Sequence, residues 1–117
     1  MAISDKDRKR LWAKSGNCCA ICKQKLVMSN ANGLDYNIGE ECHIVSSKVS
    51  GPRYETGLVN YDVYENLILL CRNHHKTIDD VSNLSKYSKQ CLLDIKSKHE
   101  SWVEERLSDN KKSYCVH

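Results

Sequence analysis

The sequence contains no long hydrophobic run. No apolar stretch in its 117 residues approaches the roughly 20 residues that a membrane-spanning helix needs. Residues 1–10 are mostly polar and charged, where a secretory signal peptide would be hydrophobic. We therefore expect a cytoplasmic protein.

Internal repeats and low-complexity segments are absent, and proline is nearly absent. The length indicates a single domain. We place this domain at residues 1–107, ending in a packing helix at about residues 85–107, and we expect residues 108–117 to be a flexible tail. The one proline, Pro52, lies in the segment SSKVSGPRYETGLVNY, residues 46–61, which we predict to be a long irregular loop.

The seven cysteines are not arranged like a disulfide framework. Their number is odd, and Cys18, Cys19 and Cys22 crowd together while the others are scattered. This pattern is typical of a reduced compartment, in which metal binding is a more common use of cysteine than disulfide formation.

Turn and capping residues divide the chain into short elements. Ser4, with Asp7 three residues later, predicts the start of a helix that stops at Gly16. We expect strands at residues 25–28 and 40–46. The second of these is rich in β-branched residues, which favour strands. A further helix should begin at Asn73 or His74.

Two short motifs have the spacing of a zinc site. Cys19 and Cys22 form a CxxC pair, and Cys71 and His74 form a CxxH pair. Four such N/S ligands hold tetrahedral Zn²⁺ in structural sites. Cys18 competes with Cys19 as a ligand, but the two-residue spacing to Cys22 favours Cys19.

The imidazole of His75 is not needed as a ligand of the predicted zinc site. His75 and Asp79 lie one helical turn apart and so share a helix face. An imidazole and a carboxylate suit a more labile divalent ion, such as Mg²⁺ or Mn²⁺. Asp80 points elsewhere on the helix and is a weaker candidate.

Four segments, in this order, resemble the HNH family of ββα-metal nucleases: CAIC at 19–22, ECHIVS at 41–46, GPR at 51–53 and ENLILLCRNHHKTID at 65–79. The resemblance covers residues 16–80. It implies a small α+β fold, in which a ββα-metal core with a structural zinc knuckle is flanked by an N-terminal and a C-terminal helix.

The resemblance also implies roles for individual residues. His43 would be the general base that takes a proton from water, since imidazole titrates near neutral pH. Asn66 would brace the long loop through side-chain hydrogen bonds. His75 would bind the catalytic ion with Asp79, and the ion would stabilise charge on the scissile phosphate.

One position departs from the family pattern. Many members have an Asp directly before the first His, where this chain has Cys42, a soft ligand poorly matched to Mg²⁺. Glu41 is our first choice for the missing carboxylate, because it lies on the same strand face as His43, and Glu40 is the alternative.

Several basic residues flank these motifs within a segment that is acidic as a whole. Residues 26–80 contain four Lys or Arg and eight Asp or Glu, which suits a divalent cation. Lys48, Arg72 and Lys76 would contact a nucleic-acid backbone. Arg53 would either make a bidentate contact to a phosphate through its guanidinium group or be an ordinary exposed loop arginine.

The function expected from these residues is metal-dependent cleavage of DNA by an endonuclease or nickase. The alternative is a non-catalytic zinc module that binds nucleic acid or a protein, with Cys42 marking the decay of the metal site. Target choice is expected to come from a partner protein, as for HNH proteins of restriction and phage-defence (antiviral) systems. A homodimer would allow two sites to cut both strands.

Overall fold

The computed structural model describes residues 2–116 and, within the last helix, side chains as far as residue 108. Its helices and strands, in chain order, are α1 (Asp5–Lys14), β1 (Val27–Ser29), β2 (Asp35–Asn37), β3 (Gly39–His43), η1 (Tyr64–Asn66), β4 (Leu67–Cys71), α2 (Arg72–Asp79), η2 (Val81–Asn83) and α3 (Lys89–Val116).

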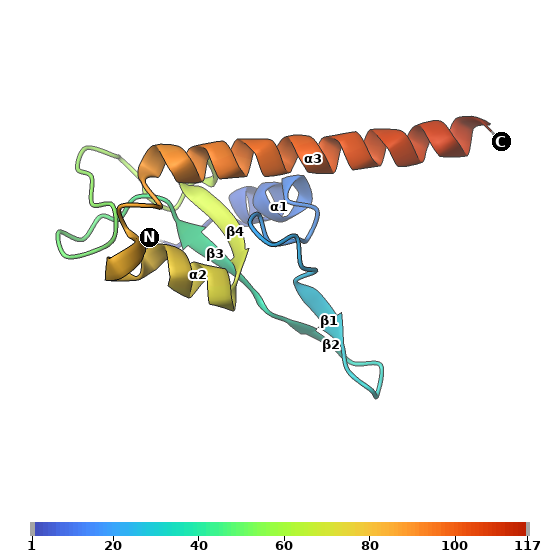
Figure 1. The fold of residues 1–117 in the computed structure, drawn as a ribbon, viewed down its shortest axis with the longest axis horizontal. Helices are drawn as coiled ribbons and strands as arrows, with labels where there is room; N and C mark the ends of the chain where they lie inside the picture. The colour runs from blue at the N-terminus through green and yellow to red at the C-terminus, as the bar shows by residue number, and fades with distance from the viewer. Residues whose placement is uncertain (1, 117) are drawn as a thin grey trace.

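Two antiparallel strands and the helix that follows them form the centre of the molecule. In the β3–β4 pair, Gly39 lies opposite Cys71 and His43 opposite Leu67. Helix α2 contacts both strands, and α1 contacts β4 and α3. Figure 1 shows α1 and α3 on one side of the strands and α2 on the other. This arrangement confirms the small α+β fold that the sequence predicts.

Strand β4 is the core of this layered structure. All five of its residues are buried, with exposed fractions between 0% and 4%. A strand covered on both faces reads as a continuous apolar run, which explains the segment LILL. The polar ligands Cys71 and His74 come directly after this run, so the rigid core fixes their position.

Local signals in the sequence explain both ends of α1. The Ser4 hydroxyl caps α1 by accepting a hydrogen bond from the Asp7 backbone N–H at 3.1 Å. Beyond α1, Gly16 has a φ of 61°, a conformation that glycine adopts readily. Helix α2 begins at Arg72, directly after Cys71.

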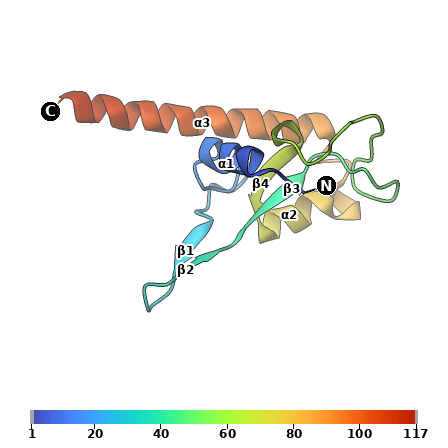
Figure 2. The same ribbon diagram turned by 180° about the vertical axis from the view of Figure 1, so that it is seen from behind.

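The sequence did not predict β2. All three of its residues are exposed and the strand is only three residues long, so burial imposes no hydrophobic pattern on it. It pairs with β1, and the two strands form a hairpin that projects from the rest of the molecule (Figures 1 and 2).

Helix α3 begins at Lys89 and continues to Val116, beyond the predicted end at residue 107. The expected flexibility of residues 108–117 stays a prediction, because residue 117 and the side chains after residue 108 lie outside the described part. Over the described residues, no helix combines the length and the apolar character that crossing a membrane requires.

Lys96 on α3 is buried against η1. Its Nζ donates to the Tyr64 carbonyl at 2.6 Å and lies 3.5 Å from the centre of the Tyr64 ring. Burial lowers the pKa of Lys96 to about 8 from an ordinary value of 10.5. This contact attaches α3 to the segment that carries Asn66.

The buried Lys96 predicts that the protein becomes more stable, relative to a Lys96→Met variant, as pH rises from about 8 to about 10. Below pH 8 the amine is protonated both folded and unfolded, so the folded state bears the full cost of burying the charge. Above about 8 the folded protein releases this proton, whereas the unfolded chain keeps it until about 10.5.

Over these roughly two pH units, the free energy of unfolding of the wild type should rise by roughly 2 to 3 kcal/mol relative to that of the variant. Urea denaturation of both proteins at about pH 7 and pH 10 measures it. If the difference in stability between wild type and variant is the same at both pH values, Lys96 keeps its ordinary pKa.

Candidate metal centre and active site

The predicted zinc ligands come together in the folded chain. The Sγ atoms of Cys19, Cys22 and Cys71 and a ring nitrogen of His74 all lie within 4.8 Å of one another. The Cys22 and Cys71 sulfurs are 3.9 Å apart, and Nδ1 of His74 is 3.8 Å from Cys19 Sγ and 3.3 Å from Cys71 Sγ. A zinc tetrahedron with Zn–S bonds of about 2.3 Å has edges of roughly 3.8 Å. These four residues therefore fit Zn²⁺.

Two different local structures supply these ligands. Cys19 and Cys22 lie in a tight turn after α1, where Lys23 has a φ of 65° and its N–H donates to the Cys19 carbonyl at 2.9 Å. Cys71 ends β4, and His74 lies in the first turn of α2. The Ala20 N–H also donates to the Leu69 carbonyl at 3.0 Å, which joins the turn to the core strand.

The thiols of the cluster are poised for a cation. Burial raises the pKa of Cys19, but backbone hydrogen bonds outweigh this effect and the net shift is downward. Burial and the neighbouring sulfurs Cys19 and Cys71 raise the pKa of Cys22 to about 11. Closely spaced thiolates repel one another unless a positive charge lies between them, and a bound Zn²⁺ would supply that charge.

Asn66 connects the two ends of the long loop between β3 and η1. Its side-chain oxygen accepts from the Val45 N–H at 3.0 Å, and its amide nitrogen donates to the carbonyls of Val45 and Tyr61 at 3.1 and 3.0 Å. The residue is buried. His43, two residues before Val45, is thereby placed at the end of β3 on a firmly anchored backbone.

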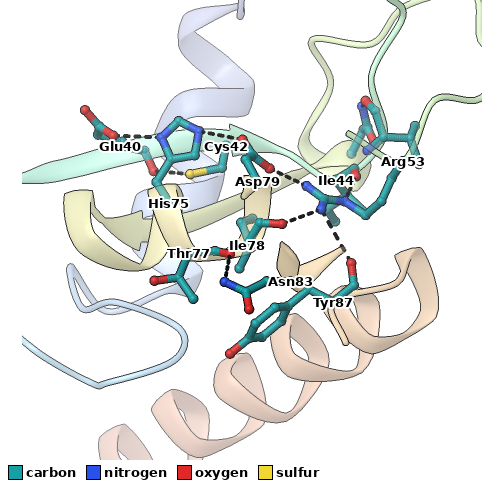
Figure 3. Close-up of polar contacts among 12 residues, drawn as sticks. Glu40, Cys42, Ile44, Arg53, His75, Thr77, Ile78, Asp79, Asn83 and Tyr87 are labelled. Atoms are coloured by element: carbon teal, nitrogen blue, oxygen red, sulfur yellow. Dashed lines mark hydrogen bonds and ion pairs between the residues drawn. The ribbon is translucent and has the colours of Figure 1, made fainter. Parts of the chain in front are cut away.

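His75 lies between two carboxylates. Its Nδ1 is 2.7 Å from Oε1 of Glu40, and its Nε2 is 3.2 Å from Oδ2 of Asp79 (Figure 3). Hydrogen bonds to Asp79 and Cys42 raise the pKa of His75 to about 11. Without a metal ion, the ring is therefore protonated at neutral pH, and an ion bound there would replace a proton.

The structure corrects the choice of Glu41 as the carboxylate beside His75. Side chains alternate along β3, and it is Glu40 that faces α2 and contacts His75. The Glu41 carboxylate instead accepts from Trp12 Nε1 at 2.7 Å and Arg8 Nε at 3.3 Å, both on α1. Glu40 therefore replaces Glu41 in the candidate metal site.

Cys42 is a buried thiol that points toward the same side of β3 as Glu40. Its Sγ donates to the Glu40 carbonyl at 3.3 Å. Burial raises the pKa of this thiol. In this arrangement Cys42 acts as a hydrogen-bond donor to the backbone.

The structure also corrects both expectations for Arg53. Its side chain is only 6% exposed, so it is neither an exposed loop arginine nor available to a phosphate. Figure 3 shows the guanidinium reaching into the site, where it donates to the Ile44, Ile78 and Tyr87 carbonyls. It also forms an ion pair with Asp79 at 2.6 Å.

This ion pair fixes Asp79 between an arginine and an imidazole. Burial alone would raise the pKa of Asp79, but hydrogen bonds from His75 and Arg53 outweigh it and hold the pKa below its ordinary value. One carboxylate oxygen faces Arg53 and the other faces His75. Asp79 is therefore ionised and oriented before any ion binds.

Two hollows meet at His75 and Asp79. A cavity of about 290 Å³ is lined by both residues and by His43, Lys48 and Tyr61, among others. A second hollow of about 410 Å³ is lined by His75 and Asp79 together with Glu40, Arg72 and Lys76. The candidate base, the candidate metal ligands and the three expected phosphate contacts thus surround one surface region.

The candidate catalytic ion has a less complete site than zinc. Among the described residues, the Cys19 cluster is the only group of three or more His, Cys, Asp or Glu ligand atoms within 4.8 Å of one another. Glu40, His75 and Asp79 offer the N and O donors that Mg²⁺ or Mn²⁺ prefers. They now bond to each other, so their side chains would have to turn to bind one ion together.

Sequence reasoning missed Asp62. Its Oδ1 lies 2.6 Å from Nε2 of His43, the candidate base. Asp62 stands 19 residues from His43, in a segment without a metal-ligand or capping pattern. Only the folded loop brings the two together.

Comparison with known proteins agrees with this geometry. The sequence profile of a family described as HNH endonuclease matches residues 19–82, which is more than half of the chain. A search of curated proteins found no match. The matched region begins at the first zinc ligand and includes β3, the long loop, β4 and α2. The chain therefore belongs to the HNH endonuclease family.

Proposed function

We propose that this protein is a divalent-metal-dependent endonuclease or nickase that hydrolyses phosphodiester bonds in DNA. The main support is that His43, His75 and Asp79, from the end of β3 and from α2, line a single cavity of about 290 Å³. A base and metal ligands that face the same space are what hydrolysis of a phosphodiester requires. Membership of the HNH family supports the same chemistry.

In this proposal His43 acts as the general base. Its side chain is 43% exposed, so a water molecule can reach the ring. The imidazole accepts a proton as the water oxygen attacks the phosphorus. Asn66 contributes by fixing the backbone on both sides of the loop, which holds His43 at one distance from the phosphate.

Glu40, His75 and Asp79 would hold the divalent ion. When bound, it would supply positive charge to the scissile phosphate and to the departing oxygen. Arg53 keeps Asp79 ionised and turned toward His75. Lys48, on the side of His43, and Arg72 and Lys76, beyond His75, would contact the DNA backbone on either side of the cut.

A plasmid-nicking assay tests this proposal. We expect the zinc-loaded protein to relax supercoiled DNA in the presence of Mg²⁺ or Mn²⁺, and we expect His43→Ala to lower the rate by about 10² to 10⁴-fold, the usual contribution of a general base. The exposed Lys98→Ala variant on α3 serves as the control, and zinc content and circular dichroism verify folding. Equal rates for wild type and His43→Ala would contradict the proposal.

The biological setting is part of the same proposal. The protein would be the nuclease component of a restriction or phage-defence system, in which a partner protein selects the target. Affinity capture from the native host, with washing that leaves only stable complexes, identifies such a partner. A homodimer would appear in the same preparation as a doubled mass in light scattering.

A non-catalytic zinc module that binds nucleic acid or a protein is the second candidate. The observation that favours it is the position of His75, whose two ring nitrogens are both bonded to carboxylates rather than directed at an open site. Titration of Mn²⁺ into zinc-loaded protein separates the two functions. A second binding event that His75→Ala abolishes, at one zinc per chain, favours the nuclease, and its absence favours the module.

A further inference from the structure

The contact between His43 and Asp62 has the geometry of an oriented base. The carboxylate oxygen lies 2.6 Å from Nε2, and the Asp62 side chain is 15% exposed whereas that of His43 is 43% exposed. A mostly buried carboxylate therefore contacts one edge of an imidazole ring that is otherwise accessible to solvent. A carboxylate cannot donate a proton to this contact when ionised, so the proton must belong to Nε2.

This contact determines which nitrogen can act. In neutral histidine one ring nitrogen carries the proton and the other has the lone pair. With the Nε2 proton donated to Asp62, the lone pair lies on Nδ1. Nδ1 is then the atom that accepts a proton from water.

The surrounding loop is built to keep the two side chains together. One side chain, that of Asn66, bonds both to Val45, two residues after His43, and to Tyr61, directly before Asp62. The Tyr61 hydroxyl donates to the Glu55 carbonyl at 2.6 Å. The Asp62 N–H donates to the Asn60 side chain at 2.9 Å. The segments that carry the base and the carboxylate are thus joined by one buried amide.

We propose that Asp62 is the positioning residue for His43: it fixes the ring orientation and the Nε2–H tautomer, so that Nδ1 is the basic nitrogen. This inference rests on the nuclease function proposed above. As water attacks, its proton passes to Nδ1 and its oxygen bonds to phosphorus. The departing sugar oxygen leaves with the electron pair of the broken P–O bond and takes a proton from solvent. The Asp62 carboxylate faces the imidazolium that forms.

The Asp62→Asn variant tests the tautomer directly. Its amide can donate to Nε2, which would move the ring proton of His43 to Nδ1 and remove the basic lone pair. We expect ¹⁵N spectra of the zinc-loaded protein to show the Nε2–H form in wild type and a gain of the Nδ1–H form in Asp62→Asn. The nicking rate should fall by about 100-fold or more at nearly constant KM, as for other bases in the wrong tautomer. The same substitution at an exposed α3 residue, Asp94→Asn, is the control.

A double variant separates positioning from general support of the fold. If Asp62 acts only through His43, Asp62→Ala should slow nicking in the wild-type background but have no further effect in a His43→Ala background. A further loss there, or a wild-type ring already in the Nδ1–H form, would overturn the proposal. The spectra require no activity: if wild type shows Nε2–H but cuts no DNA, the nuclease function fails and the inferred His43–Asp62 geometry stands.

Discussion

Removing zinc is expected to unfold the protein. Chelation, or the substitution Cys71→Ser, should abolish the helical signal in circular dichroism and release the one zinc ion. Structural zinc in small domains contributes roughly 10 to 16 kcal/mol of apparent binding free energy near neutral pH, whereas whole domains are stable by only about 5 to 15 kcal/mol. Loss of this ion therefore removes a free energy comparable to the total stability of the domain.

The position of the four zinc ligands explains why loss of the ion should affect the whole domain. Cys22 and Cys71 are 49 residues apart, so a bound zinc ion would close a loop that contains β1, β2, β3 and the long loop between β3 and η1. Cys71 lies at the junction of β4 and α2, next to the residues that carry His75. A chain without zinc would lose the link between the turn that carries Cys19 and Cys22 and helix α2.

Cys18→Ser and Cys91→Ser provide matched controls, because neither sulfur belongs to the four-ligand group. Both variants should keep one zinc per chain and the wild-type melting temperature. Zinc content by atomic emission and thermal denaturation distinguish the variants. A Cys71→Ser protein that keeps its zinc and its circular dichroism spectrum would show that the ion is held differently, whereas zinc loss from Cys18→Ser would point to Cys18 rather than Cys19.

Replacing Arg53 by Met is expected to cost about 2 to 4 kcal/mol of stability and most of the nuclease activity. The substitution removes the ion partner of Asp79 and the donor for three backbone carbonyls near the ends of β3 and α2 and the start of α3. Leaving buried polar groups without partners is among the costlier single changes in a protein. We expect a smaller loss of stability than for a fully buried ion pair, because the Asp79 side chain is 32% exposed.

Arg53→Lys should recover only part of this loss. An ammonium cannot donate along the several directions that a guanidinium fork serves at once. Urea denaturation and the nicking assay measure both effects, and Lys98→Met, at an exposed position of α3, controls for loss of one positive charge. If Arg53→Met and Lys98→Met prove equally stable to within about 0.5 kcal/mol, Arg53 does not brace the site.

The zinc ligands could be predicted from the sequence because their signals are local. CxxC and CxxH place two ligands each on one turn of chain, whatever the rest of the fold does. The resemblance to HNH nucleases rested on four short segments, CAIC, ECHIVS, GPR and ENLILLCRNHHKTID, and the family match confirms it.

The choice between Glu40 and Glu41 could not be made in this way. Alternation along a strand shows that the two side chains point to opposite faces, but not which face α2 covers. Packing against α2 on one side and α1 on the other gives Glu40 to His75 and Glu41 to Trp12. The sequence pattern was correct, and the assignment built on it was wrong.

Arg53 and Asp62 depended entirely on tertiary structure. Both lie in the long loop, where neither periodicity nor spacing predicts burial. Arg53 is buried because three carbonyls and Asp79 converge where elements distant in sequence meet. Asp62 reaches His43 because Asn66 bonds to both neighbouring segments.

The sequence by itself thus determined the four candidate zinc ligands and the family, because both depend on residues close together in the chain. The tertiary structure alone decided which carboxylate contacts His75, which arginine is buried and which acid contacts His43. Those pairings are made by side chains 19 to 35 residues apart. Their geometry exists only after the loop has closed over the core.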